Sequence, residues 1–229
     1  MRETLRLLPL GDSITAGYTD NPKWDHPFKF GYRSGLYSRL SNVGYNFRFV
    51  GGSTEPWTGI SGDPTRGGSY TPAFDLRELG QDGHRGYGGK TAAFLNKNIL
   101  AYLAEDDPDL VLLMIGTNKQ DRKGLDKLVN TITSTKPEAN MILAQIIPKT
   151  TYQQSIVDYN SYLRDTLVPR YQALGRNITL VDLYSLFLAE PGDLTSIDSS
   201  LFSNGINHPT NQAYDAMAEA WFDAIKTIR

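Results

Sequence analysis

Three short segments of the sequence carry groups that could together bind a negatively charged oxygen. Ser13 follows an apolar run at residues 5–10 and lies near the start of a helical segment, so its N–H and the helix dipole would face a bound oxyanion. Asn118 follows another apolar run, and its side-chain amide could donate to an anionic oxygen near Ser13. The glycine-rich residues 84–91 would let backbone N–H groups approach a ligand closely. These groups suit a site that handles an oxyanion.

Each segment also has a plainer interpretation. Asp12 and Ser13 can simply cap a helix, Asn118 can form a turn after a strand, and residues 84–91 can be a turn that leads into a helix. A histidine in a loop, such as His208, is usually incidental, and the three histidines have no metal-ligand spacing. The glycine-rich segment lacks the spacing of either phosphate-binding loop.

The elements that must position these residues alternate along the chain. Apolar runs predict five strands, at residues 5–10, 45–50, 109–115, 141–147 and 178–183. Helical spacing of apolar residues predicts helices at residues 31–43, 91–103, 124–135, 151–174 and 211–228. Alternation of this kind predicts an α/β domain, a three-layer α/β/α sandwich with a five-stranded parallel sheet. Ligands bind such sheets at the carboxyl ends of the strands, where Ser13 and Asn118 are expected.

Length and composition exclude several classes of protein. The 229 residues predict a single domain over residues 1–229, with 40% hydrophobic and 21% charged residues, as in globular proteins. A net charge of −2 gives no basic field for nucleic acid or an anionic membrane, and no apolar run reaches about 18 residues. The absence of cysteine excludes disulfides, thiolate zinc sites and a cysteine nucleophile. With no apolar signal segment at the N-terminus, we expect either a cytoplasmic protein or a mature secreted domain.

Residues 51–83 interrupt the alternation of strands and helices. They are rich in Gly, Pro, Ser, Thr and Asp and contain Trp57, Tyr70 and Phe74. A loop of this length inside a compact domain is usually functional or disordered, and the aromatic residues favour ordered packing. We therefore expect a long inserted loop near the active site, whose aromatic side chains either stack on sugar rings or form the core of the loop.

In chain order, the segments together resemble the SGNH, or GDSL-type, hydrolases over nearly the whole chain. Gly11-Asp12-Ser13 is similar to the nucleophile block, and residues 86–91 to the second block, with Gly89 as its oxyanion glycine. Gly116-Thr117-Asn118 is similar to the third block, and His208-Pro209 to the histidine block. Within this group, residues 31–37, 47–51 and 84–91 resemble the acetylxylan esterases of carbohydrate esterase family three. The lipase elbow Gly-x-Ser-x-Gly is absent.

The resemblance implies a flavodoxin-like fold and a serine esterase that needs no metal or cofactor. Ser13 would be the nucleophile, His208 its base, and the Ser13, Gly89 and Asn118 N–H groups the oxyanion hole. The substrate would be a short acyl ester, most plausibly an O-acetyl group of xylan or a related polysaccharide, contacted by Asp12, Trp57, Tyr70 and Tyr87. The alternatives are a broad short-chain esterase, lysophospholipase or thioesterase, and a carbohydrate-binding pseudoenzyme.

The sequence departs from the SGNH pattern at the third member of the triad. These enzymes usually carry Asp three residues before the histidine, and that position is Gly205 here. If Asn207 is an insertion, the acid position falls on Asn204, which is neutral. We expect Asn204 or a main-chain carbonyl to orient His208, and Asp198, the nearest upstream carboxylate, is the alternative.

Overall fold

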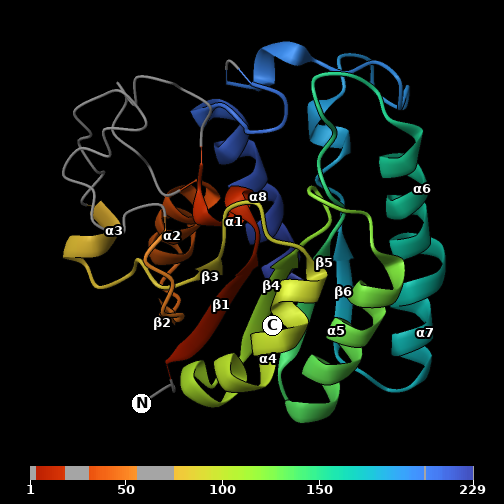
Figure 1. The fold of residues 1–229 in the computed structure, drawn as a ribbon. Coiled ribbons are helices and arrows are strands. Elements are labelled where there is room, and N and C mark those ends of the chain that lie inside the picture. Colours follow the sequence, from red (N-terminus) through yellow and green to blue (C-terminus); the bar gives the residue numbers. More distant parts are fainter. Residues whose placement is uncertain (1–3, 19–30, 56–74, 204, 229) are drawn as a thin grey trace.

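A parallel β-sheet forms the centre of the protein (Figure 1). The computed structural model describes residues 4–18, 31–55, 75–203 and 205–228. The sheet order is β2-β1-β4-β5-β6, with β3 paired to β1, and every pair of strands is parallel. The strands are β1 (Leu5–Gly11), β2 (Phe47–Phe49), β3 (Arg85–Gly86), β4 (Leu110–Met114), β5 (Asn140–Ala144) and β6 (Ile178–Val181).

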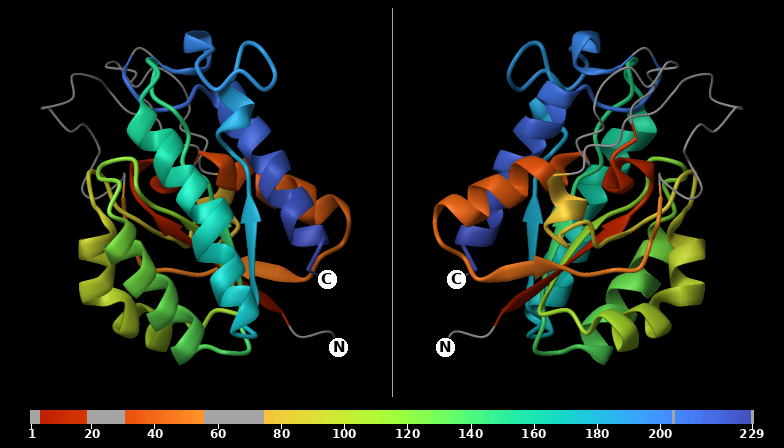
Figure 2. Two further views of the ribbon diagram at one scale, coloured as in Figure 1. Left: turned by 90° about the vertical axis from the view of Figure 1, so that its right-hand side faces the viewer. Right: turned by 90° about the vertical axis from the view of Figure 1, so that its left-hand side faces the viewer.

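Helices cover both faces of this sheet, as the two side views of Figure 2 show. One face carries α2 (Tyr32–Asn42) and α8 (Asn211–Lys226), which pack against each other. The other face carries α4 (Ala92–Asp106), α5 (Arg122–Thr135), α6 (Gln154–Tyr162) and α7 (Val168–Ala173). Two single turns, α1 (Ser13–Ala16) and α3 (Asp75–Glu78), two 3₁₀ turns, Ser185–Phe187 and Ser199–Leu201, and a π-helical segment, Leu163–Leu167, complete the described elements. The predicted three-layer α/β fold is confirmed.

The two central strands owe their position to their apolar sequences. All five residues of β4 are buried, and in β1 only Arg6 is partly exposed. A strand covered on both faces needs such a continuous apolar run, and each fully buried leucine contributes about 1.5–3 kcal/mol. The register pairs Leu10 with Leu113 and Gly11 with Met114, so the carboxyl ends of β1 and β4 lie side by side.

The sheet differs from the predicted one in an additional strand and in where several strands begin and end, since β2 is shorter than the predicted 45–50 and β6 ends before the predicted residue 183. The two-residue strand β3 was not predicted, because Arg85–Gly86 is not an apolar run and pairs only where β1 extends beyond β2. Strand β5 ends at Ala144, three residues before the predicted end, although residues 145–148 remain buried. The predicted loop at residues 51–83 contains the helical turn α3 and a bridge between Gly52 and His84.

The helix predicted at residues 151–174 contains a widened turn. A π-helical segment, Leu163–Leu167, separates α6 from α7, and Pro169 lies in the first turn of α7. Proline has no N–H to donate, and its ring clashes with the carbonyl four residues earlier. A π turn before the proline accommodates this clash while the backbone stays helical.

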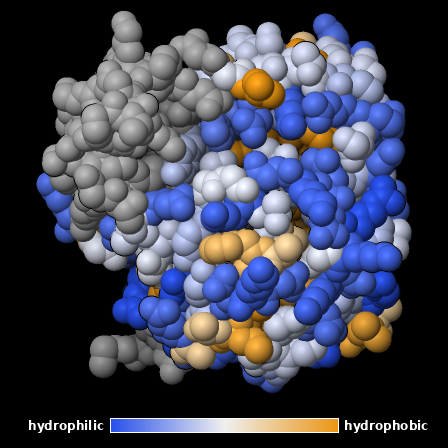
Figure 3. All heavy atoms as spheres, viewed as in Figure 1, coloured by the Kyte–Doolittle hydropathy of each residue, from blue (hydrophilic) through white to orange (hydrophobic). Residues whose placement is uncertain are grey.

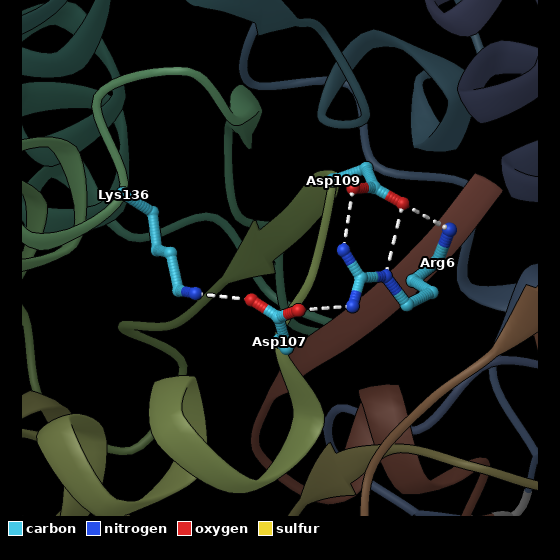
Figure 4. Close-up of polar contacts among 4 residues, drawn as sticks. All are labelled: Arg6, Asp107, Asp109 and Lys136. Atoms are coloured by element: carbon cyan, nitrogen blue, oxygen red, sulfur yellow. Dashed lines mark hydrogen bonds and ion pairs between the residues drawn. The ribbon is translucent and has the colours of Figure 1, made fainter. Parts of the chain in front are cut away.

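Charged side chains connect the amino ends of β1 and β4, at the edge opposite Ser13 (Figure 4). Asp109 accepts hydrogen bonds from the Arg6 backbone N–H (2.8 Å) and guanidinium (2.9 Å from Nη2), while Asp107 bridges Arg6 and Lys136. The hydrogen bond from Arg6 lowers the pKa of Asp109 below its usual range. Because the pKa of Asp109 is lower in the folded protein than in the unfolded chain, the bond to Arg6 stabilises the fold at pH values above the unfolded-state pKa. This stabilisation is lost as the pH falls through the lowered folded-state pKa.

The outer surface is mixed in polarity. Figure 3 shows that apolar atoms on the face carrying α4 and α5 form only small areas among polar ones. Among the residues that the structure describes, the exposed large apolar side chains are Val43, Leu79, Leu100, Tyr152, Leu174, Leu194 and Ile206. Within the described part of the chain, every helix is too short or too polar to cross a bilayer.

Candidate active site

The segments singled out in the sequence meet at the carboxyl ends of three adjacent strands. Gly11, the last residue of β1, pairs with Gly86 of β3 on one side and with Met114 of β4 on the other. A Cβ at Gly11 would lie 2.2 Å from the Met114 carbonyl oxygen, so only glycine allows the strands to approach this closely. From β1 the chain runs to β2 on one side and later to β4 on the other, which makes this the topological switch point.

Ser13 begins the single helical turn α1 directly after β1. The Asp12 carboxylate caps this turn by accepting a hydrogen bond from the Ile14 N–H (3.1 Å), and Gly17, with φ 94°, ends it. Ser13 is buried, with only 4% of its surface exposed. The strand end and the cap thus hold Ser13 in a fixed place at the switch point.

His208 lies beside Ser13, although the two residues are 195 positions apart in the sequence. Its Nε2 lies 2.8 Å from the Ser13 hydroxyl oxygen, so the hydroxyl can donate to this nitrogen when it is unprotonated. The loop before α8 holds the imidazole, because Ser203 N–H donates to the His208 carbonyl (3.0 Å) and Phe202 pairs with Pro209. This is the geometry of a serine with its general base.

Gly89 and Asn118 are connected through one tight turn. Lys90 N–H donates to the Tyr87 carbonyl (3.3 Å), and Gly89 at the third position of this turn has φ 68°, which is typical of a type II turn. The Asn118 side-chain amide donates to the Lys90 carbonyl (2.9 Å). Both Gly89 and Asn118 are exposed, and a Cβ at Gly89 would meet nothing within 4 Å. The Asn118 side chain is therefore bound to the exposed turn that contains Gly89.

Asp12 is fully buried next to Ser13. Burial raises the pKa of this carboxyl from 3.8 to about 6, and the hydrogen bond from the Ile14 N–H offsets part of the increase. Because Asp12 has no exposed surface, its carboxylate can cap α1 and influence Ser13 electrostatically, but it is not accessible to a substrate. Its burial therefore favours the capping interpretation over the predicted contact with substrate.

We expect Asp12→Asn to stabilise the fold at pH 7 by an amount on the order of 2 kcal/mol, because asparagine can keep the cap without burying a charge. Between the ordinary pKa and the raised one, the unfolded chain releases a proton that the folded protein keeps, so the wild type loses stability as the pH rises from 3.8 to about 6. Thermal unfolding at several pH values should show that the extra stability of Asp12→Asn over the wild type grows as the pH rises from 3.8 to about 6 and vanishes below pH 3.8. A gain that does not depend on pH would contradict the assignment.

Other predicted site residues have different surroundings or lie outside the described part. Tyr87 packs on Phe94 (centroids 5.2 Å apart) and Tyr102 (5.9 Å) of α4. The Asp198 carboxylate accepts from the Ser200 N–H (2.9 Å) and hydroxyl (2.6 Å), which are its only described side-chain bonds. Trp57, Tyr70, Phe74 and Asn204 lie outside the described residues.

Two neighbours of the site, Tyr18 and Glu55, carry no motif that would reveal them in the sequence, and a third, His84, belongs to the glycine-rich residues 84–91. The ring of Tyr18 stacks beside the His208 ring, with centroids 5.9 Å apart. Glu55 accepts a hydrogen bond from the Gly88 N–H, next to Gly89. His84 is buried, and burial lowers its pKa well below the usual value, so its ring is neutral. The described residues include no group of three or more His, Asp or Glu side chains that could hold a metal ion.

Comparison of the sequence with known proteins finds a match over most of its length. Residues 7–221 match the family described as GDSL-like Lipase/Acylhydrolase. A multidomain esterase from Ruminococcus flavefaciens is 26% identical over an alignment 254 residues long, which takes in 97% of this chain and 28% of that protein. The chain thus spans less than a third of the length of this curated relative.

Solved structures share the fold. A family 3 carbohydrate esterase from Clostridium thermocellum is similar with a TM-score of 0.73 and 24% identity, over 99% of this chain and 98% of that one. An acetylxylan esterase from Geobacillus stearothermophilus is similar with a TM-score of 0.60 and 17% identity, over 98% and 96% of the two chains. At these identities the likeness establishes a common architecture.

Proposed function

The chain belongs to the GDSL-like lipase/acylhydrolase family, and from that membership we propose that it is a serine esterase that removes acetyl groups from xylan or a related polysaccharide. The observation that carries the proposal is the 2.8 Å contact between the Ser13 hydroxyl and His208 Nε2 at the switch point of the sheet. The choice of acetyl esters is supported by the likeness to carbohydrate esterases and acetylxylan esterases. Residues 1–229 would form one catalytic domain, with residues 51–83 beside the substrate.

Ser13 and His208 would perform the reaction in two steps. Ser13 Oγ attacks the ester carbonyl while His208 Nε2 accepts the hydroxyl proton. The tetrahedral intermediate then collapses, the imidazolium gives its proton to the leaving alcohol, and an acetyl-serine remains. Water attacks this acyl-enzyme with His208 again as base, which releases acetate and restores the Ser13 hydroxyl.

The negative charge that develops on the carbonyl oxygen needs donors placed in advance. The Ser13 N–H at the start of α1, the Gly89 N–H and the Asn118 amide are the groups we assign to this oxyanion hole. The bond from Asn118 to the Lys90 carbonyl uses one proton of its NH₂ group, and the second proton remains for substrate. We also propose that Trp57, Tyr70 and Tyr87 contact the sugar.

We propose that Asn204 or a main-chain carbonyl orients His208, and that Asp198 instead caps the 3₁₀ turn Ser199–Leu201, where its Oδ1 accepts both bonds from Ser200. A neutral partner fixes the tautomer but does not stabilise the imidazolium by charge. We therefore expect Asn204→Asp to raise kcat/KM for p-nitrophenyl acetate and Asp198→Ala to change it little. Loss of most activity in a folded Asp198→Ala protein, with no gain from Asn204→Asp, would assign the acid role to Asp198.

The test of the function is a comparison of substrates. Acetate release from acetylated xylan should exceed that from the Ser13→Ala control, and p-nitrophenyl acetate should be turned over faster than esters of longer acyl chains. Faster turnover of long-chain esters, lysophospholipids or thioesters would refute the acetylesterase assignment. Binding of xylan without release of acetate or p-nitrophenol would identify a carbohydrate-binding protein without catalysis.

A further inference from the structure

One carboxylate connects the two halves of the candidate active site. Glu55 Oε2 accepts a hydrogen bond from the Gly88 N–H and another from the Tyr18 hydroxyl (3.2 Å). Gly88 precedes the proposed oxyanion residue Gly89, and the Tyr18 ring stacks beside that of His208. A Cβ at Gly88 would lie 3.1 Å from Glu55 Oε2, so the turn and the carboxylate are in close contact.

The bond to Gly88 fixes the turn that presents Gly89. In a turn formed by Tyr87 to Lys90, the central peptide joins Gly88 to Gly89, and types I and II differ by a flip of this peptide that reverses the direction of the Gly89 N–H. Glycine at both central positions makes the turn permissive to either type. Three hydrogen bonds hold it: Gly88 to Glu55, Lys90 to the Tyr87 carbonyl, and Asn118 to the Lys90 carbonyl.

The protein interior holds Glu55 itself in place. His84 Nδ1 accepts a hydrogen bond from the Gly86 N–H (3.0 Å), which places the ring proton on Nε2, and Nε2 donates to the Glu55 carbonyl (2.8 Å). The Glu55 N–H donates to Ser53 Oγ (3.3 Å), whose hydroxyl donates to the Gly86 carbonyl (2.9 Å). The segment that carries Glu55 is thus bound to strand β3, directly before the oxyanion turn.

We infer that Glu55 is a positioning residue of this esterase: its carboxylate selects the conformation of the Tyr87–Lys90 turn that aims the Gly89 N–H at the oxyanion. Through Tyr18 the same carboxylate supports the position of the His208 ring. The inference rests on the proposed function. It assigns to Glu55 no contact with substrate, so its effect should appear in the rate of the chemical step.

Three variants separate the hydrogen bonds from the charge. Glu55→Ala removes the acceptor, and we expect kcat for p-nitrophenyl acetate to fall about tenfold with a smaller change in KM, because a misplaced donor fails mainly in the transition state. Glu55→Gln keeps an oxygen that can accept both bonds and should restore kcat to within about threefold of the wild type. Tyr18→Phe keeps the ring beside His208 but removes one donor to Glu55, and its kcat should lie between those of Glu55→Ala and Glu55→Gln. Glu138→Ala, which removes an exposed carboxylate on the surface, is the matched control.

Exchange of the Gly88 amide proton, followed by NMR, provides a readout of the turn. Protection should be lost in Glu55→Ala and kept in Glu55→Gln, with thermal midpoints confirming that both variants fold. If the wild type cleaves p-nitrophenyl acetate and Glu55→Ala has the same kcat, the inference is wrong and the proposed function stands. The same conclusion follows if the kcat of Glu55→Gln is as low as that of Glu55→Ala. A wild type that cleaves no ester would refute both.

Discussion

Replacing Ser13 with alanine is expected to lower kcat/KM for p-nitrophenyl acetate and for acetylated xylan by roughly 10⁴-fold or more, because no acyl-enzyme can form without the hydroxyl. The fold should keep its thermal midpoint within a few degrees. The Asp12 cap on Ile14 does not involve the Ser13 side chain, and alanine is a good helix former.

The measurement is steady-state turnover of both substrates, with thermal unfolding followed on the same preparations. Ser41→Ala is the matched control, because it removes an exposed hydroxyl in the last turn of α2, on the side of the sheet where the strands begin, and should leave activity and stability unchanged. Near-normal turnover by a folded Ser13→Ala protein would refute the mechanism, whatever the substrate.

The second large effect is expected from Asn118→Ala, which should lower kcat by roughly 10²-fold. A donor to the oxyanion binds more strongly as the carbonyl oxygen gains charge, so the loss should fall on kcat with a smaller change in KM. The variant also loses the bond to the Lys90 carbonyl, which is exposed and should cost about 1 kcal/mol of stability or less.

Kinetic constants and thermal midpoints of Asn118→Ala and of Asn130→Ala would test this expectation. Asn130 is exposed on α5, so its replacement controls for the loss of a surface amide. If only KM rises in Asn118→Ala while kcat is kept, Asn118 binds the substrate in its ground state and does not belong to the oxyanion hole.

The parts of the protein that the sequence predicts well are those governed by local pattern. The apolar runs of β1 and β4 are continuous because both strands are buried on both faces, and their carboxyl ends must then meet at one edge of the sheet. This rule alone places Ser13 near Asn118. The family resemblance adds His208, whose loop has no periodicity to place it.

The parts that the sequence does not predict depend on contacts between distant segments. Strand β3 consists of only Arg85 and Gly86, and it exists because β1 continues beyond the end of β2. Glu55 is unremarkable in sequence, and its contact with Gly88 arises only when residues 51–55 fold back along β3. A pattern within one window of sequence cannot contain such a contact, so neither could be predicted.

The 195-residue separation of Ser13 and His208 has a consequence for synthesis. A nascent chain can pair β1 with β2 once residue 49 has left the ribosome, but β4 arrives only with residue 114, and the imidazole with residue 208. Pairing of this range is slow, because the entropy of closing long loops is lost before the contacts form. The proposed nucleophile therefore remains without its proposed base until residue 208 has been synthesised and the sheet has closed, so we expect the nascent chain to have no esterase activity before that point.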